Sequence, residues 1–355
     1  MAKNKLNNER EKTNIAENAI LKKSEEISGI SIRGWDFNKG VDYSGIIDSF
    51  TSIGFQATNL AKAIDIIKKM KQDKAFIFLG YTSNMVSSGL RDIFRYLAEH
   101  KLIDVIITSA GGVEEDFIKC LGDFKLGSFN ADGTLLREKG INRIGNIFVP
   151  NSRYVRFEKF VIPVLEKIRE KIKNENKEKK GDNKEILTPS KLIKILGEEI
   201  GKYDKGKESI YYWCAKNSIP VFCPAIMDGS LGDMIYFFKS KNPDFKLDIS
   251  DDAWELNNTT IGKNKTGMII LGSGVVKHAI CNANLYRNGA DYAVYINSFQ
   301  EFDGSDSGAN CEEAKSWGKI KGSLESESVK VVGDATILFP LIVASTFAKN
   351  ITGKN

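Results

Sequence analysis

The sequence contains few residues of the kinds that build metal sites and disulfide frameworks. It has two histidines and an odd number of cysteines, five, and no two cysteines form a C-x-x-C pair. We therefore expect reduced thiols, and neither a zinc site nor a disulfide framework. The five cysteines are Cys120, Cys214, Cys223, Cys281 and Cys311.

Long apolar runs are also absent. No run approaches the roughly 18 residues that span a bilayer, and residues 1–14, MAKNKLNNEREKTN, lack the apolar centre of a signal peptide. We therefore expect a cytosolic protein that does not bind a membrane. The net charge of +5 is the difference between 51 basic and 46 acidic residues. This mild excess makes nucleic acid a weak expectation as a partner.

Apolar residues make up 42% of the 355 residues, enough to bury a sizeable core in one large or two ordinary domains. Short apolar runs that end in small or polar residues occur at 75–81, 103–112, 219–234, 267–280 and 293–297. Helical patterns occur between them, at 46–69 with a break near Gly54, and at 87–100, 113–121, 159–172 and 187–200. This alternation predicts an α/β fold, a doubly wound, Rossmann-like parallel sheet with helices on both faces.

Sheets of this kind bind ligands beyond the carboxyl ends of their strands, where the glycine-rich turns of this chain are expected. The usual G-x-G-x-x-G motif is absent, because Gly272 and Gly274 are followed by Val275, Val276 and Lys277. Taken alone, GSG after a strand is either a weak nucleotide signal or a tight strand-to-helix turn.

Two segments lack an apolar pattern that could form a core. Residues 1–28 are polar with a weak apolar rhythm, which indicates a frayed or disordered extension. Residues 171–186 contain a charge run typical of a solvated surface insertion. We expect residues 29–350 to form a single α/β domain that carries this insertion.

The stretch 301–320, EFDGSDSGANCEEAKSWGKI, concentrates carboxylates ahead of one lysine, Lys319. The acidic residues lie among glycines and serines, which predicts a loop that suits a cationic ligand; they are Asp303, Asp306 and Glu313. Lys319 follows Trp317, and an aromatic neighbour can remove water from an amine and favour the nucleophilic free base. An acidic surface loop with a solvated lysine is the alternative.

Nine blocks of the chain, in order, carry a more specific signal. They are DFNKGVDY (36–43), GFQATN (54–59), TSNMVSSG (82–89), AGGVEEDFIKCLG (110–122), NRIGN (142–146), MDGSLGDM (227–234), VVKHAICNANL (275–285), GADYAVYIN (289–297) and SDSGANCEEAKSWGKI (305–320). Together they resemble the deoxyhypusine synthase family from about residue 30 onward. We expect each block to lie at a strand-end turn.

The resemblance implies a reaction. Members of that family transfer an aminobutyl group from spermidine to one lysine of a translation factor, and NAD holds the hydride between the two steps. The resemblance also implies a homotetramer with active sites shared across a dimer interface, and an N-terminal helix that gates a neighbouring subunit's site. Two alternatives stay open: a homospermidine synthase that uses putrescine as acceptor, and a non-catalytic partner subunit of an active paralogue.

The resemblance also assigns residues. It implies that Lys319 forms the imine and that His278 is the base. The residues implied to bind substrate are Glu114, Glu115, Asp233, His278, Gly304, Ser305, Asp306, Glu313, Trp317 and Lys319. The residues implied to contact NAD are Ser83, Asn84, Met85, Val86, Ser87, Ser109, Ala110, Gly111, Glu115, Asp228, Ser273, Ser298, Phe299, Asp334 and Ala335.

Some of these residues also have simpler interpretations. Asp233 could cap a helix, and a histidine on a helix is more often structural, as we expect for His100. Ser273 replaces a family glycine and would crowd the cofactor if its backbone had a positive φ. The more usual Arg-Pro of the family is Asn310-Cys311 here. None of these departures removes a group that the chemistry needs.

Overall fold

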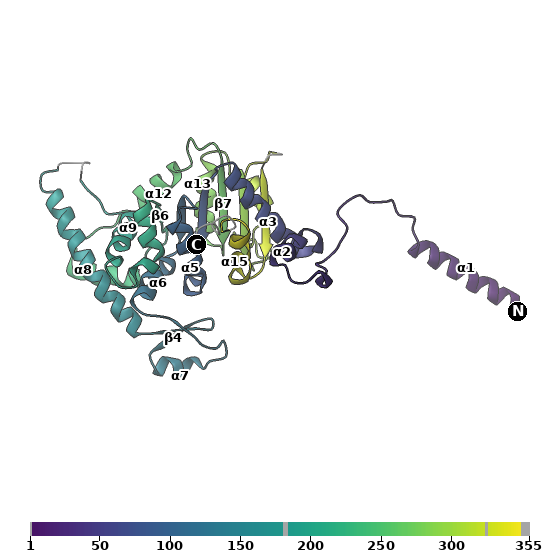
Figure 1. Ribbon diagram of the computed structural model, residues 1–355, viewed down its shortest axis with the longest axis horizontal. Helices are drawn as coiled ribbons and strands as arrows, with labels where there is room; N and C mark the ends of the chain where they lie inside the picture. The colour runs from purple at the N-terminus through teal and green to yellow at the C-terminus, as the bar shows by residue number, and fades with distance from the viewer. Residues whose placement is uncertain (1, 180–183, 324–325, 349–355) are drawn as a thin grey trace.

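The computed structural model describes residues 2–179, 184–323 and 326–348. Its centre is a six-stranded sheet in which every neighbouring pair of strands is parallel, in the order β6-β2-β1-β7-β8-β9 (Figure 1). The strands are β1 (Phe76–Tyr81), β2 (Val105–Thr108), β6 (Val221–Phe222), β7 (Thr266–Leu271), β8 (Tyr292–Asn297) and β9 (Glu327–Val332). The predicted parallel sheet is confirmed, and β9 is an edge strand that was not predicted.

Alternate residues of the central strand β1 enter two separate apolar cores, because successive side chains of a strand point to opposite faces. Ile77 and Leu79 belong to the larger core and Phe78 to the smaller one. The larger core is covered by α3 (Phe55–Gln72), α4 (Ser83–Ser87), α5 (Leu90–Glu99), α6 (Ala110–Leu121), α8 (Ser152–Glu175), α9 (Pro189–Ile200), α10 (Ile210–Asn217), α11 (Ser230–Lys241) and α15 (Ala335–Ser345). The smaller core is covered by α12 (Ile249–Asn258), α13 (Val275–Leu285) and α14 (Cys311–Ser316). Helices therefore lie on both faces, as a doubly wound fold requires.

The order in which the chain adds strands to the sheet reverses between β1 and β7. From β1 it runs outward through β2 to β6, and from β7 it runs outward through β8 to β9 on the other side. Open parallel sheets form a ligand crevice beyond the carboxyl ends of their strands at such a point. The turns that follow β1 and β7, at residue 82 and at residues 272–274, flank this position.

Local signals account for several helix boundaries. The break between α2 (Tyr43–Ile53) and α3 lies at Gly54, whose φ of 98° favours glycine. Thr188 caps α9 through the Lys191 amide, and Pro189 occupies the first turn as predicted. α6 begins at Ala110, three residues before the predicted start at residue 113, and α8 begins at Ser152 rather than near residue 159.

Two predictions about the family-like blocks are wrong. Glu313 lies in the short helix α14 rather than in a loop, because the side chain of Asn310 accepts a hydrogen bond from the Glu313 amide and starts the helix. Residues 142–146 lie in an antiparallel hairpin rather than at a parallel-strand turn, residues 36–43 lead into α2, and residues 54–59 form the junction of α2 and the start of α3.

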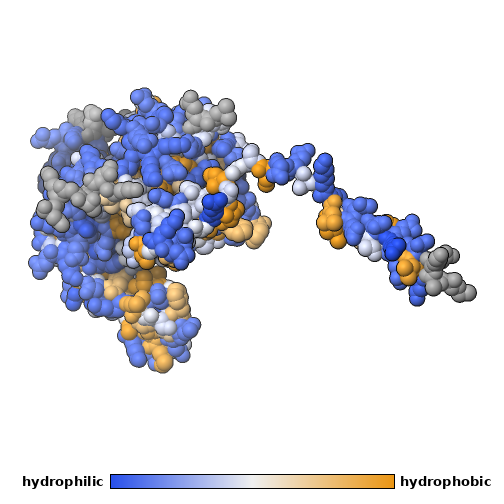
Figure 2. All heavy atoms as spheres, turned by 45° about the vertical axis from the view of Figure 1, so that its right-hand side comes forward, coloured by the Kyte–Doolittle hydropathy of each residue, from blue (hydrophilic) through white to orange (hydrophobic). Residues whose placement is uncertain are grey.

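The hairpin is part of a small second sheet that was not predicted. It contains β3 (Lys125–Leu126), β4 (Ile141–Ile144) and β5 (Ile147–Pro150), in the order β3-β5-β4, with α7 (Gly133–Glu138) beside it. This unit projects from the body of the molecule (Figure 1) and exposes apolar side chains (Figure 2). Leu126 and Phe129 are among the exposed apolar residues.

The N-terminal extension contains a helix, α1 (Ala2–Ile20), which stands apart from the body at the end of an extended segment (Figure 1). Among residues 5–34, every side chain is exposed, so no core fixes this helix to the chain that bears it. In the charged insertion, residues 171–175 continue α8, and residues 180–183 lie outside the described ranges. None of the helices in the described ranges combines the length and apolarity that crossing a bilayer requires.

Candidate active site

Two pockets share the loop that follows β8. The first, which we call the lysine pocket, has a volume of about 440 Å³ and is lined by Lys277, His278, Cys281, Asn282, Leu285, Gly304, Asp306, Ala309, Asn310, Glu313, Ala314, Trp317 and Lys319. The second, the glycine-turn pocket, has a volume of about 660 Å³ and is lined by Thr82, Asn84, Met85, Gly272, Ser273, Gly274, Asn297, Ser298, Phe299, Ser307, Gly333, Asp334 and Ala335.

Lys319 is held firmly at its backbone and is 9% exposed. Its amide donates to the Ala314 carbonyl at the end of α14, and its carbonyl accepts from the amide of Ala290, which lies just before β8. Gly318, with a φ of 73°, permits the turn between the helix and this contact. The Lys319 amino group lies 5.7 Å from the centre of the Trp317 ring, so the predicted aromatic neighbour is in place.

The acidic loop contributes unequally to the lysine pocket. Asp306 lines it, and its Oδ2 atom is buried without a hydrogen-bond partner among the described residues. A buried, unpartnered carboxylate oxygen is costly unless a ligand satisfies it. Asp303 instead accepts from the Ser305 amide at 2.8 Å, and neither of these two residues is among the lining residues. Glu313 lines the pocket from α14.

His278 reaches the same pocket from the first turn of α13. Its Nδ1 atom lies 3.0 Å from the side-chain amide of Asn282, one helical turn further on. Sequence reasoning missed Asn282 and Leu285, which also line the pocket. The i to i+4 spacing of Asn282 from His278 was the only signal that could have found the first of them. His100, by contrast, ends α5, as a structural histidine would.

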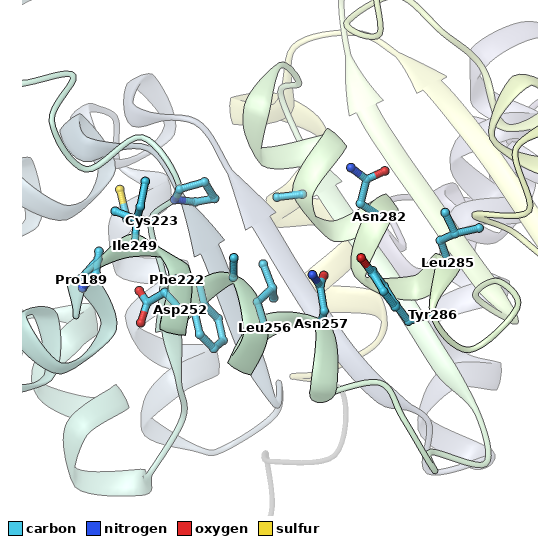
Figure 3. A pocket seen from close by; sticks show the side chains of 13 residues that line it. Pro189, Phe222, Cys223, Ile249, Asp252, Leu256, Asn257, Asn282, Leu285 and Tyr286 are labelled. Carbon is cyan, nitrogen blue, oxygen red and sulfur yellow. The ribbon is translucent and has the colours of Figure 1, made fainter. Parts of the chain in front are cut away.

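α13 separates the lysine pocket from a third, largely apolar cavity of about 430 Å³. This cavity lies between α12 and α13, and Asn282, Leu285 and Tyr286 enter its wall from α13 (Figure 3). Two residues therefore belong to both spaces, Asn282 and Leu285. None of the predicted site residues lines this third cavity.

The remaining predicted acids form a separate group near α6 and α11, and they line neither the lysine pocket nor the glycine-turn pocket. Glu114 accepts from the Leu231 amide at 2.7 Å. Burial raises the pKa of Glu115 from 4.5 to about 7, the nearby Glu114 adds to this rise, and a hydrogen bond from Ser87 opposes it. Within one chain these acids, and the exposed Asp233 on α11, are not gathered around Lys319.

Seven of the residues implied to contact NAD line the glycine-turn pocket: Asn84, Met85, Ser273, Ser298, Phe299, Asp334 and Ala335. The others, Ser83, Val86, Ser87, Ser109, Ala110, Gly111, Glu115 and Asp228, do not. Ser83 and Gly111 nonetheless bring the starts of α4 and α6 together, because a Cβ on Gly111 would lie 2.6 Å from that of Ser83.

Ser273 avoids the backbone conformation that would crowd a cofactor. The flanking Gly272 and Gly274 have φ values of 82° and 67°, but Ser273 is not among the non-glycine residues with positive φ in the described chain. Its hydroxyl donates to the Ser307 carbonyl at 3.0 Å. The condition for the expected conflict with the cofactor is therefore not met.

Known proteins resemble this chain over most of its length. A family model described as deoxyhypusine synthase matches residues 45–346. A Drosophila melanogaster protein named "probable deoxyhypusine synthase" is 50% identical, with 94% of each chain covered. The deoxyhypusine synthase of Senecio vernalis is 50% identical and covers 93% of this chain and 92% of its own.

A crystal structure from Entamoeba histolytica, provisionally described as a deoxyhypusine synthase, is also similar. Its TM-score is 0.62 at 34% identity, over 89% of this chain and 97% of the other. The family model and the two relatives each cover most of the chain, including the loop that bears Lys319. The chain belongs to the deoxyhypusine synthase family.

Proposed function

We propose that this deoxyhypusine synthase takes the aminobutyl group of spermidine, holds it as an imine on Lys319, and passes it to one lysine of a translation factor. The observation that carries the proposal is the lysine pocket, in which a buried lysine, a histidine, a tryptophan and an unpartnered carboxylate oxygen meet. The pocket offers both groups that a linear polycation needs: carboxylates for its charged ends and an aromatic wall for its methylenes.

The glycine-turn pocket fits NAD as the cofactor. Three strand-to-helix turns contribute residues to its wall, and Asp334 supplies an acid of the kind that binds a ribose hydroxyl. NAD, when bound, accepts a hydride from spermidine and later returns it to the product. We assign its contacts to the lining residues Asn84, Met85, Ser298, Phe299, Asp334 and Ala335, and to the backbone of Ser273.

In the lysine pocket, Asp306 and Glu313 would bind the amines of spermidine, and Trp317 would lie along its methylenes. Loss of a hydride from the carbon beside the secondary amine, and of a proton from the nitrogen, leaves an imine. We assign removal of the proton to His278.

Lys319 then attacks the imine carbon. A new C–N bond to Lys319 forms, the bond to the departing nitrogen breaks, and diaminopropane leaves. The acceptor lysine repeats the exchange and frees Lys319, and the returned hydride converts the product imine to an amine. The burial of Lys319 helps to keep water from the intermediate, which would otherwise hydrolyse.

We further propose that the acids on α6 and α11 complete the site of a neighbouring subunit, in a homotetramer. Glu114, Glu115 and Asp233 are charged or titratable groups near two helix starts, but they do not line the lysine pocket of their own chain. In the same assembly α1 would cover a neighbour's entrance, which is consistent with its position apart from the body. Because the acceptor is a translation factor, we expect the enzyme in the cytosol.

The comparisons do not favour homospermidine synthase or a non-catalytic subunit. The test is to incubate the protein with NAD and spermidine, add borohydride, and map the modified peptide. We expect one added aminobutyl group on Lys319 and none in Lys319→Ala. NADH without an adduct would reject Lys319 as the nucleophile, and transfer to putrescine in preference to the translation factor would reject the acceptor.

A further inference from the structure

Four consecutive carbonyl oxygens of the loop after β8 are each bound by a side chain. The segment is 306–309, and it belongs to neither a helix nor a strand. The contacts are Lys277 Nζ to the carbonyls of Asp306 and Ala309, Ser273 Oγ to that of Ser307, and Lys330 Nζ to that of Gly308. We call Ser273, Lys277 and Lys330 the carbonyl clamp.

Lys277 is the centre of the clamp. Its side chain is 1% exposed, although lysine is seldom fully buried. The amino group donates to two carbonyls, at 2.8 Å in the case of Ala309, and lies 5.0 Å from the centre of the Tyr295 ring. A buried amino group without such acceptors would be strongly destabilising, so its place in the fold depends on these loop contacts.

The clamped segment forms the wall between the two pockets. Asp306 and Ala309 line the lysine pocket, and Ser307 lines the glycine-turn pocket. The segment is also packed backbone against backbone, because a Cβ on Gly308 would lie 1.6 Å from the carbonyl oxygen of Gln300. The placement of the backbone of residues 306–309 therefore determines where the Asp306 carboxylate lies.

We propose that Lys277, assisted by Ser273 and Lys330, is a positioning residue that holds the Asp306 carboxylate in the donor site. Lys277 directly precedes His278 on α13, so the same helical turn carries the base and fixes the acid relative to it. The inference rests on the proposed function, because it assigns Asp306 to spermidine. Lys277 acts through the backbone of the loop and takes no part in the transfer itself.

The test is a double-mutant cycle read from steady-state NADH formation. Lys277→Met should raise the KM for spermidine about tenfold and leave the KM for NAD within about twofold. In an Asp306→Asn background the same substitution should change the KM for spermidine by less than about twofold, because the carboxylate it positions is gone. Equal effects in the two backgrounds would overturn the proposal.

Lys71→Met is the matched control. Lys71 also donates to a backbone carbonyl, that of Thr346 at 2.6 Å, and lies 5.4 Å from the centre of the Phe347 ring, but it is remote from both pockets. It should leave both KM values unchanged, and a rise in the KM for spermidine in this variant would also overturn the proposal.

If Lys277→Met does not fold, Ser273→Ala takes its place. It removes one donor of the clamp and should raise the KM for spermidine about threefold. Lys277→Arg, which keeps a donor, should raise this KM by less than Lys277→Met. No rise in Ser273→Ala would then reject the clamp. If the wild-type protein forms no NADH from spermidine, the proposed function fails, whereas normal wild-type activity with an unchanged KM in Lys277→Met rejects only this inference.

Discussion

The side-chain amide of Asn282 lies 3.0 Å from Nδ1 of His278. A neutral imidazole donates from one nitrogen and accepts at the other, so the atom that Asn282 presents decides what Nε2 can do. The atom that faces Nδ1 here is Nδ2 of Asn282, which donates to Nδ1, so Nε2 carries the proton of a neutral ring. For His278 to act as the base through Nε2, the side-chain amide must turn so that its oxygen accepts from Nδ1–H.

Asn282→Leu should therefore lower kcat by about tenfold, which corresponds to the loss of one hydrogen bond of about 1.4 kcal/mol. Asn282→Asp should keep the contact and, because a carboxylate favours imidazolium, move the acidic limb of the pH profile of kcat to higher pH. NADH formation across a pH series measures both. An unchanged profile in both variants would show that Asn282 does not govern His278.

The raised pKa of Glu115 predicts that the free energy of unfolding depends on pH. Its folded pKa is raised from 4.5 to about 7, chiefly by burial. Below pH 4.5 the carboxyl is protonated in both the folded and unfolded states, and the shift has no effect on stability. As the pH rises towards 7, the unfolded state loses its proton first, so the folded state is destabilised, by up to about 3 kcal/mol.

Glu115→Gln should accordingly raise the melting temperature by several degrees at pH 8 and by little at pH 4.5. Thermal unfolding at the two pH values measures this difference. The exposed Glu158→Gln serves as control and should change neither value. A gain of the same size at both pH values would mean that the benefit of glutamine is unrelated to the charge.

Ser273→Gly should not tighten the binding of NAD. Since Ser273 does not have a positive φ and its hydroxyl binds the Ser307 carbonyl, the glycine removes a clamp contact without relieving a conflict with the cofactor. We expect the Kd for NAD to stay within about twofold of that of the wild type, by calorimetric titration. A clear gain in affinity would mean that the serine does crowd the cofactor.

Removal of residues 1–28 should leave the melting temperature within about 1 °C, because the side chains of residues 5–34 are exposed and add nothing to a core. If α1 covers a neighbour's entrance, the truncated enzyme should also form more NADH per aminobutyl group transferred, since water reaches the imine. A marked loss of stability would show that residues 1–28 contribute to the stability of the fold, and an unchanged ratio of NADH to product would reject the gate.

The sequence predicted the centre of the fold better than its edges. β1, β7 and β8 are buried throughout or nearly so, and they read as continuous apolar runs. β9 (ESVKVV) is only partly buried, so charged residues interrupt its pattern and it escaped prediction. The small antiparallel sheet was missed because its strands are two to four residues long, too short for a periodic signal.

At the site, the resemblance located Lys319, His278, Trp317 and Asp306, which the fold brings into one pocket. It did not locate Lys277, because a lysine in a sequence is expected to be exposed and its acceptors here are backbone carbonyls. Every residue has a backbone carbonyl, so the residue types do not indicate which carbonyls accept a hydrogen bond. Such contacts become visible only once the chain is folded.

The carbonyl clamp also limits how this loop can be engineered. Its donors come from the turn after β7, from α13 and from β9, each more than 20 residues from the carbonyl that it binds. A chimera that received only residues 301–311 from a relative would carry the new loop without the side chains that hold this loop in the relative. Transplanting the polyamine specificity of one family member into another therefore requires moving three distant donor positions together with the loop.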